Sequence, residues 1–355
     1  MARIAGVLAT AAAVLAVALP AAAQPADEAL LAAIRAEGLE RSQVMEHVGW
    51  LSDVYGPRFT GTPAIEEAGA WTMDTLRGWG LANVHAERFA FGAGWSLERV
   101  HAHLVEPQVM PVIGYPKSWS SGTGGTVTAE VVRVDLRTEA DLDRYRGRLR
   151  GKIVLTQPAR EVPMLTGDVV LRMDDELLAE AARPVGPTPA GRGGRGFGIR
   201  GLGFTGLQQF YVDEGVVAEV DRGSDFVHVA GGSGLSHSTQ RTDGGTIFVG
   251  RGGRWNTEPP GTRVPSLTFA VEHYNRMVRL LDMGLPVRME LHVETRFHPE
   301  AEADEGLNAF NILAELPGTD LADEVVMIGA HFDTTHASTG ATDNAVGAGK
   351  IGEDV

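Results

Sequence analysis

The chain has 355 residues, a length that permits two domains that each enclose a hydrophobic core. Its net charge of -15 at pH 7, without any basic stripe, argues against a nucleic-acid partner. The absence of cysteine excludes disulfides, thiolate catalysis and zinc–thiolate sites.

The first 23 residues have the pattern of a secretory signal peptide. Arg3 precedes an alanine-rich apolar stretch over residues 4–19, and Pro20 then leads to three alanines before Gln24. A basic start, an apolar core and a small-residue end are typical of a signal peptide cut after Ala23. A retained membrane anchor is the alternative. We therefore expect an exported protein, secreted, extracellular or periplasmic, with no membrane span once the signal is removed.

Hydrophobic periodicity predicts several elements between residues 24 and 97. The expected helices cover residues 27–39, 44–54 and 63–79, and an expected strand covers residues 83–91. A turn-rich loop, residues 58–63, connects the second and third helices. The mixture of helices and a strand indicates an α/β domain that begins here and resumes at residues 298–355.

Residues 98–297 have a different texture, in which short β-like runs alternate with glycine-rich turns. The expected strands cover residues 127–134, 152–156, 246–249, 264–269 and 289–294, and an expected helix covers residues 271–283. Residues 184–206 are rich in proline, glycine and arginine without periodicity and predict a mobile loop. The pattern favours a β-rich domain inserted into the α/β domain.

The strongest chemical signal follows an expected strand at residues 308–315 and a turn. Residues 325–330 are a continuous apolar run, which predicts a buried parallel strand. His331 and Asp333 follow it, and residues i and i+2 of a strand project from the same face. Ligands of open α/β sheets bind at this end of the strands. Imidazole plus carboxylate suits a divalent metal, and zinc accepts both ligand types.

A second reading of these residues is purely structural. Asp333 could end the strand, and Asp343 could cap a helix that starts near Asn344. This reading explains each aspartate separately. It does not explain why a histidine, two carboxylates and a loop of small residues occur together at one strand end.

Other motifs fail on their context. Residues 196–201 and 201–206 match G-x-G-x-x-G, but no strand precedes them and a dinucleotide site needs one. Residues 347–350 resemble the end of a phosphate loop, but the first glycine and the magnesium-binding Ser or Thr are absent. His101 and His103 share a strand face without an accompanying carboxylate pattern, which is typical of surface or core histidines.

The segment 331–333 and the following residues 340–347 resemble the signature of secreted co-catalytic di-zinc exopeptidases, the carboxypeptidase Q-like zinc aminopeptidases with a protease-associated domain. Residues 55–63 and 311–318 are similar to other segments of that family. The resemblance implies an α/β, zinc-exopeptidase-like sandwich with a mostly parallel sheet. A β-rich, protease-associated-like inserted domain would interrupt it at residues 98–297.

The resemblance also implies roles for individual residues. His331 would bind one zinc, and Asp343 would bridge two zinc ions. Asp333 is assigned to the catalytic group as the carboxylate that accepts the other ring N–H of His331. His336 would line the substrate pocket. The peptide bond between Asp343 and Asn344 would be cis. The implied function is a zinc exopeptidase of the aminopeptidase or dipeptidase type, which hydrolyses peptide bonds through a metal-activated water.

The family requires further ligands, namely a Glu-Glu pair, another carboxylate and a histidine, all well downstream of the bridging aspartate. The few residues after Asp343 contain no second cluster of this kind. We therefore expect a truncated or frame-shifted chain that lacks the downstream ligands and the general base. The alternative function is a non-catalytic exported module that binds peptides or proteins through the inserted domain.

Overall fold

The computed structural model describes residues 28–160, 203–223, 262–321 and 323–353, together with positions 175–176, 179, 249–250 and 252. The expected signal peptide lies outside these residues. So do nearly all of the expected strand at residues 246–249 and most of the expected loop at residues 184–206.

Most helices occur where the hydrophobic periodicity predicts them. The described helices are α1 (Glu28–Glu40), α2 (Val44–Gly49) with a π-helical continuation (Trp50–Val54), α3 (Pro63–Gly78), α5 (Gly203–Glu214), α6 (Val271–Asp282) and α7 (Val346–Glu353). Short 3-10 helices cover Glu139–Arg144, Glu300–Glu302 and Asp304–Gly306, and a π-helical turn covers Ala341–Ala345. The expected loop at 184–206 is wrong at its end, because α5 already begins at Gly203.

The described strands form two separate sheets. Their bounds are β1 (Ala82–Phe89), β2 (Gly94–Glu106), β3 (Met110–Pro111), β4 (Gly114–Pro116), β5 (Val127–Arg133), β6 (Lys152–Leu155), β7 (Ala218–Asp221), β8 (Ser266–Phe269), β9 (Arg288–His298) and β10 (Ala309–Glu315). Strands β1 and β10 pair with each other, and the other eight have the order β3-β2-β9-β5-β6-β7-β8-β4.

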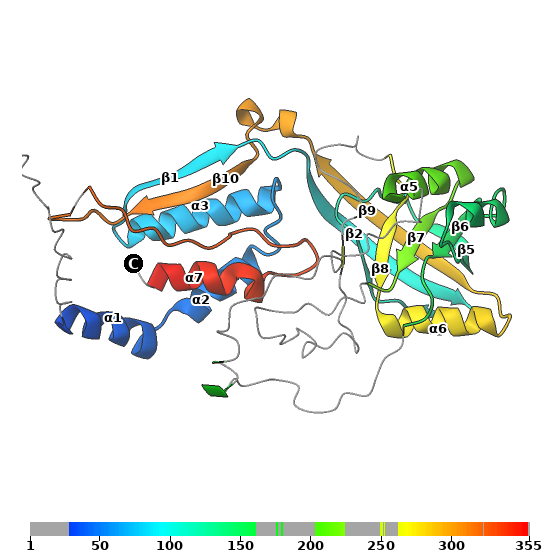
Figure 1. The fold of residues 1–355 in the computed structure, drawn as a ribbon, viewed down its shortest axis with the longest axis horizontal. Helices are drawn as coiled ribbons and strands as arrows, with labels where there is room; N and C mark the ends of the chain where they lie inside the picture. The colour runs from blue at the N-terminus through cyan, green and yellow to red at the C-terminus, as the bar shows by residue number, and fades with distance from the viewer. Residues whose placement is uncertain are drawn as a thin grey trace, which may run out of the picture.

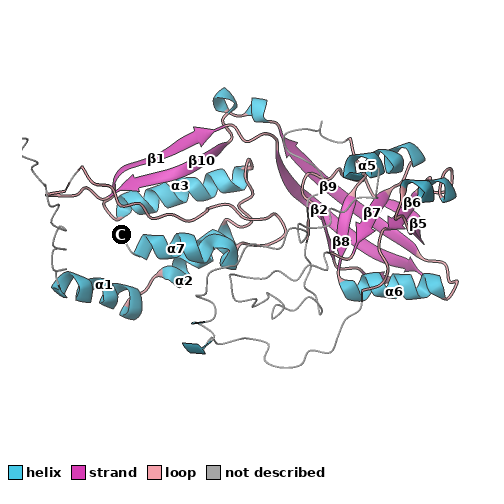
Figure 2. Ribbon diagram, viewed as in Figure 1, coloured by secondary structure: helices cyan, strands magenta, loops and turns pink. Residues whose placement is uncertain are grey.

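The α/β class is confirmed, and the larger sheet is mixed. Strands β5, β6, β7 and β8 run parallel, whereas β2, β3, β4 and β9 join antiparallel to their neighbours. Figures 1 and 2 show this sheet with α5 and α6 on opposite sides, while β1, β10, α3 and α7 gather elsewhere in the molecule. The long strands β2 and β9 extend from the larger sheet toward the other part.

Alternating side chains in the parallel strands separate two cores in the larger sheet. Ile153 and Leu155 of β6 pack into the core that contains α6, and Val154 packs into the core that contains α5. Helix α6 contributes Tyr274 and Met277 to its core, a spacing of one helical turn. Each fully buried side chain of this size stabilises the fold by about 1.5–3 kcal/mol relative to exposure.

Trp95, near the start of β2, connects the larger sheet to the loop that follows α2. Its side chain is fully buried, and its indole N–H donates to the Ser120 carbonyl over 2.9 Å. The ring lies edge-on to His336 with 4.9 Å between centroids, and 6.5 Å from the centroid of Phe59. One tryptophan therefore contacts three segments that are distant in sequence.

The predicted buried parallel strand at residues 325–330 is wrong. The segment forms no strand with any described residue, and Val325, Val326 and Met327 are 81%, 94% and 80% exposed. An apolar run becomes a strand only where another strand offers a free hydrogen-bonding edge. Among the described strands β10 pairs with β1 on one side and has its other edge free, but residues 325–330 do not pair with that edge.

Candidate functional site

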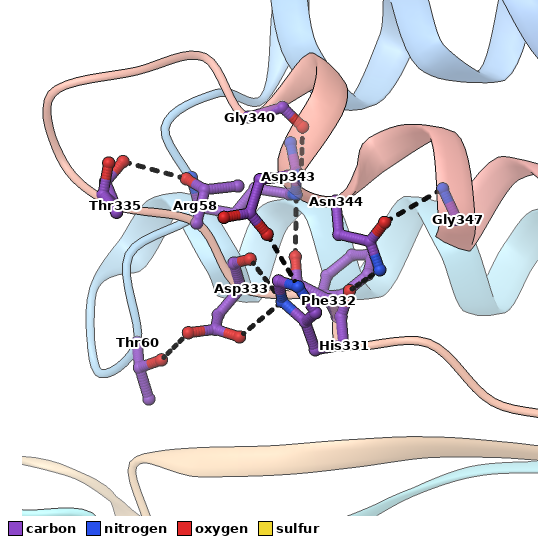
Figure 3. Close-up of polar contacts among 11 residues, drawn as sticks. Arg58, Thr60, His331, Phe332, Asp333, Thr335, Gly340, Asp343, Asn344 and Gly347 are labelled. Atoms are coloured by element: carbon purple, nitrogen blue, oxygen red, sulfur yellow. Dashed lines mark hydrogen bonds and ion pairs between the residues drawn. The ribbon is translucent and has the colours of Figure 1, made fainter. Parts of the chain in front are cut away.

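The structure brings His331, Asp333 and Asp343 together, with the imidazole ring between the two carboxylates (Figure 3). Nε2 of His331 lies 2.8 Å from Oδ1 of Asp343. Nδ1 lies 3.3 Å from Oδ1 of Asp333 and 3.1 Å from the Asp333 carbonyl oxygen. The three side chains are at least half exposed, so a ligand from solvent can reach them.

The two acceptors beside Nδ1 of His331 favour a ring that carries a proton there. Nε2 then has two options. It can donate a second proton to Asp343 in a charged ring, or it can offer its lone pair to a cation that also contacts Asp343. This is the arrangement in which a second carboxylate fixes the tautomer of a metal-binding histidine.

Asn344 connects the start of α7 to His331. Its Oδ1 accepts from the Gly347 N–H over 3.2 Å, and its Nδ2 donates to the His331 carbonyl over 3.5 Å. A Cβ on Gly347 would lie 2.4 Å from Oδ1 of Asn344, so a larger residue would displace the amide. The side chain that accepts from a backbone N–H in the first turn of α7 is therefore Asn344 and not Asp343, which the structural reading had expected to cap this helix. The Asp343–Asn344 peptide bond is cis, as the resemblance implies.

Arg58 is the site residue that the sequence analysis missed. Its side chain is fully buried, and its backbone N–H donates to Oγ1 of Thr334 over 3.0 Å. The Thr334 N–H donates in return to the Arg58 carbonyl over 2.9 Å. Burial lowers the pKa of Arg58, and the nearby Asp333 carboxylate partly offsets this. The sequence placed this position in a turn-rich loop and in the segment 55–63 that resembles the family, but assigned it no role in the site.

The segment that contains these residues matches a known protein family. Residues 311–353 match the model of Peptidase family M28, and His331, Asp333 and Asp343 all lie within the match. The chain is 23% identical to carboxypeptidase Q of Mus musculus over 316 residues, which are 88% of this chain and 53% of that protein. It is 23% identical to carboxypeptidase Q of Homo sapiens over 318 residues, with the same coverage. The chain is similar to the M28 peptidases.

The fold is also similar to that of a solved M28 peptidase structure. The crystal structure of a Peptidase M28 precursor from Shewanella amazonensis SB2B superposes with a TM-score of 0.53 at 19% sequence identity. The match covers 92% of this chain and 62% of that chain. The chain spans about half the length of the curated carboxypeptidase Q relatives that it matches.

The M28-matching segment brings together two side chains of the kinds that bind zinc. Nitrogen of His331 and oxygen of Asp343 are donors that zinc accepts. Among the described residues, however, no group of three or more His, Asp or Glu side chains is placed to bind one metal ion. A catalytic zinc takes three protein ligands, so the donors fit zinc in kind but are incomplete in number.

His101 and His103 lie on one face of β2, as expected, with 5.8 Å between their ring centroids. The neighbouring strand β9 adds His292, whose centroid is 5.2 Å from that of His101, and Glu290, whose Oε1 is 3.7 Å from Nε2 of His101. A carboxylate therefore accompanies the pair, although none of the described residues completes a metal-binding group here.

A cavity of about 480 Å³ adjoins His331 and Asp333. Much of its lining is apolar and comes from α3, β1, β10 and the segment before His331, including Trp71, Phe89, Phe310 and Ile328. His331 therefore lies at the edge of an aromatic cavity in the M28-matching segment.

His336 does not line this cavity. Its side chain is buried, and Nε2 donates to the Pro116 carbonyl over 2.7 Å. The ring packs against Trp95 and against Phe59, whose centroid is 5.7 Å away. The predicted place of His336 in a substrate pocket finds no support in the cavity beside His331.

His336 is expected to make the fold sensitive to mild acid. Burial lowers its pKa below the ordinary value of 6.5, and the hydrogen bond to Pro116 only partly opposes this. The folded protein thus keeps His336 neutral, whereas the unfolded chain binds a proton as the pH falls through 6.5. Stability that is fully present above that pH is therefore lost below it.

The comparison is between the wild type and His336→Gln, which keeps an N–H donor for Pro116 but does not titrate. Urea unfolding at pH 7, 6 and 5 should show a steeper loss of stability in the wild type. His273 and His298, whose pKa values are also lowered by burial, are present in both proteins, so the difference isolates His336. Equal pH dependence in the two proteins would contradict the prediction.

Proposed function

We propose that this chain carries part of the active site of a zinc-dependent exopeptidase, of the aminopeptidase or dipeptidase type, that hydrolyses peptide bonds. The observation that carries the proposal is the position of His331 between Asp333 and Asp343, inside the segment that matches Peptidase family M28. The carboxypeptidase Q relatives, named for a peptidase activity, support the same reaction class.

In this proposal Nε2 of His331 and the carboxylate of Asp343 hold zinc. When bound, zinc supplies Lewis acidity toward a peptide carbonyl and makes water a better nucleophile. Asp333 accepts the Nδ1 proton of His331 and thereby keeps Nε2 free for the metal. The side-chain amide of Asn344 donates to the His331 carbonyl and so helps to position the backbone of the histidine. The second zinc of the family site would share Asp343.

Hydrolysis needs a third zinc ligand and a general base in addition. The resemblance assigns these groups to residues that follow the bridging aspartate in the family. We expect this chain to bind zinc more weakly than a site with three protein ligands, and to hydrolyse peptides only to the extent that such groups are supplied.

The domain division supports a second candidate, a peptide- or protein-binding module at residues 98–297. The ends of an inserted domain must lie side by side, and Leu97 of β2 pairs with Thr295 of β9. Between them the larger sheet encloses its own two cores. This candidate predicts binding of peptides without zinc and without cleavage.

The experiment is zinc titration of the chelator-treated protein by calorimetry, together with cleavage of aminoacyl and dipeptide substrates. Zinc binding should be lost in His331→Ala but retained in His85→Ala, since His85 is a partly exposed histidine of β1 outside the site. Cleavage, where present, should follow bound zinc. Zinc binding that is unchanged in His331→Ala would contradict the proposed site, and peptide binding without zinc or cleavage would favour the binding module.

We also infer export, on the pattern of residues 1–23 alone. Within the described ranges, no helix has both the length and the apolar character needed to cross a membrane. N-terminal sequencing of the protein from its natural compartment should give Gln24 as the first residue. Retention of Met1 on a membrane-bound protein would favour the anchor instead.

A further inference from the structure

One buried cation contacts both ends of the loop that carries the candidate zinc ligands. The guanidinium of Arg58 has Nε donating to the Phe332 carbonyl over 2.9 Å, between His331 and Asp333 in sequence. Its Nη2 donates to the Gly340 carbonyl over 3.3 Å, shortly before Asp343. The two carbonyls lie at the two ends of residues 332–340. The planar guanidinium of Arg58 binds both and thereby fixes the distance between them.

Further contacts of the same side chain leave it little freedom. Nη1 donates to the Thr339 carbonyl over 3.3 Å and to the Leu51 carbonyl at the end of the second helix. The Phe332 ring lies 5.7 Å from the guanidinium carbon. The guanidinium has five N–H donors in a rigid fork, and here they reach four carbonyls in different directions. No other standard side chain can make this set of contacts.

The local backbone is built around this arginine. Gly340 has a φ of 74°, in the left-handed region, and a Cβ there would lie 2.0 Å from Cγ2 of Thr334 and 3.1 Å from Nη2 of Arg58. A Cβ on Gly56 would lie 2.5 Å from the Thr339 carbonyl oxygen. The loop and the segment before Arg58 therefore approach each other more closely than side chains would allow.

Burial of a guanidinium among carbonyls is costly unless it serves a compensating interaction. The carboxylate that acts on Arg58 is that of Asp333, which also accepts from the His331 ring. The charge of Arg58 thus interacts electrostatically with the group that orients the histidine. The Asp333 carboxylate also accepts a hydrogen bond from the Thr60 hydroxyl over 3.4 Å, and Thr60 lies two residues after Arg58.

We propose that Arg58 is a positioning residue for the metal site: by fixing the carbonyls of Phe332 and Gly340, it sets the separation of His331 and Asp343. The inference rests on the proposed zinc site for its functional meaning, but the positioning itself exists in the metal-free chain. It assigns a role in the site to a residue more than two hundred positions earlier in the sequence.

The test uses Arg58→Met and Arg58→Lys in the full chain. Methionine keeps bulk without donors, and lysine keeps the charge but lacks the fork. Two readouts are compared with the wild type: the ring ¹⁵N signals of His331 in the metal-free protein, and the zinc dissociation constant. Asp343→Asn supplies the ring signals of a histidine that has lost its charged partner. Met277→Ala, a buried residue of α6, controls for loss of stability far from the site.

Both Arg58 variants should move the His331 ring signals toward those of Asp343→Asn and weaken zinc binding by roughly 10- to 100-fold, the range for residues that orient a metal ligand. Met277→Ala should change neither readout, even where its melting temperature falls further. Unchanged ring signals in Arg58→Lys and in Arg58→Met would overturn the proposal, as would equal effects in Met277→Ala. A wild type that binds no zinc, with ring signals that still respond to Arg58, would refute the proposed function and leave the positioning intact.

Discussion

Asp343→Asn is expected to lower the affinity of the chain for zinc by about 100-fold or more. The carboxylate lies 2.8 Å from Nε2 of His331, so it is the charged group that would share a cation with that nitrogen. Asparagine has nearly the same shape, but its neutral amide oxygen is a weaker ligand for zinc than a carboxylate oxygen. Loss of a residue that only orients a ligand costs about 10- to 100-fold, and loss of a ligand should cost at least as much.

The measurement is competition with a chromophoric chelator at neutral pH. Asp333→Asn should give the smaller effect, since Asp333 contacts the ring through Nδ1 and not the proposed metal position. Asp282→Asn, an exposed aspartate paired with Arg133 at the end of α6, serves as the control and should leave the affinity unchanged. If Asp333→Asn weakened zinc binding more than Asp343→Asn, the assigned roles would have to be exchanged.

Trp95→Ala is expected to reduce the free energy of unfolding by about 3–5 kcal/mol, the usual cost of removing a large buried aromatic side chain. The residue is fully buried, and its loss would remove the contact surface of His336 and leave the Ser120 carbonyl without its indole donor. Urea unfolding followed by circular dichroism measures this change.

Trp95→Phe is the matched variant. It retains an aromatic ring but not the N–H, and its cost should be nearer 1 kcal/mol, the net value of a typical hydrogen bond, plus a small packing term. A loss below about 1 kcal/mol in Trp95→Ala would mean that the three segments around the ring repack without it.

Elements with strong local periodicity could be predicted from the sequence. Helix α3 and helix α6 occupy almost the residues that their apolar spacing indicated. The juxtaposition of His331 with Asp333 also follows from local geometry, since the two lie two positions apart on an extended segment. Asp343 is grouped with them by its place in the sequence, but its bridging role came only from the resemblance, because its distance from His331 depends on the whole intervening loop.

Features that depend on distant segments could not be predicted. The apolar run at 325–330 has every local property of a strand, but a strand also requires pairing with another strand, and the run pairs with none of the described ones. Arg58 lies in a turn within the family-like segment 55–63, but nothing in that segment signals its burial or its contacts with residues 332–340. The partners of His101 lie on β9, almost two hundred residues later, so the sequence of β2 alone could not reveal Glu290.

The exposed run before His331 has a consequence for how the protein behaves at high concentration. Val325, Val326 and Met327 present apolar side chains to solvent, and their backbone does not pair with any described strand. Such a segment is a template for strand exchange between molecules, and it favours self-association that grows with concentration. His331 directly follows residues 325–330. Self-association through these residues and zinc binding at His331 would therefore depend on each other.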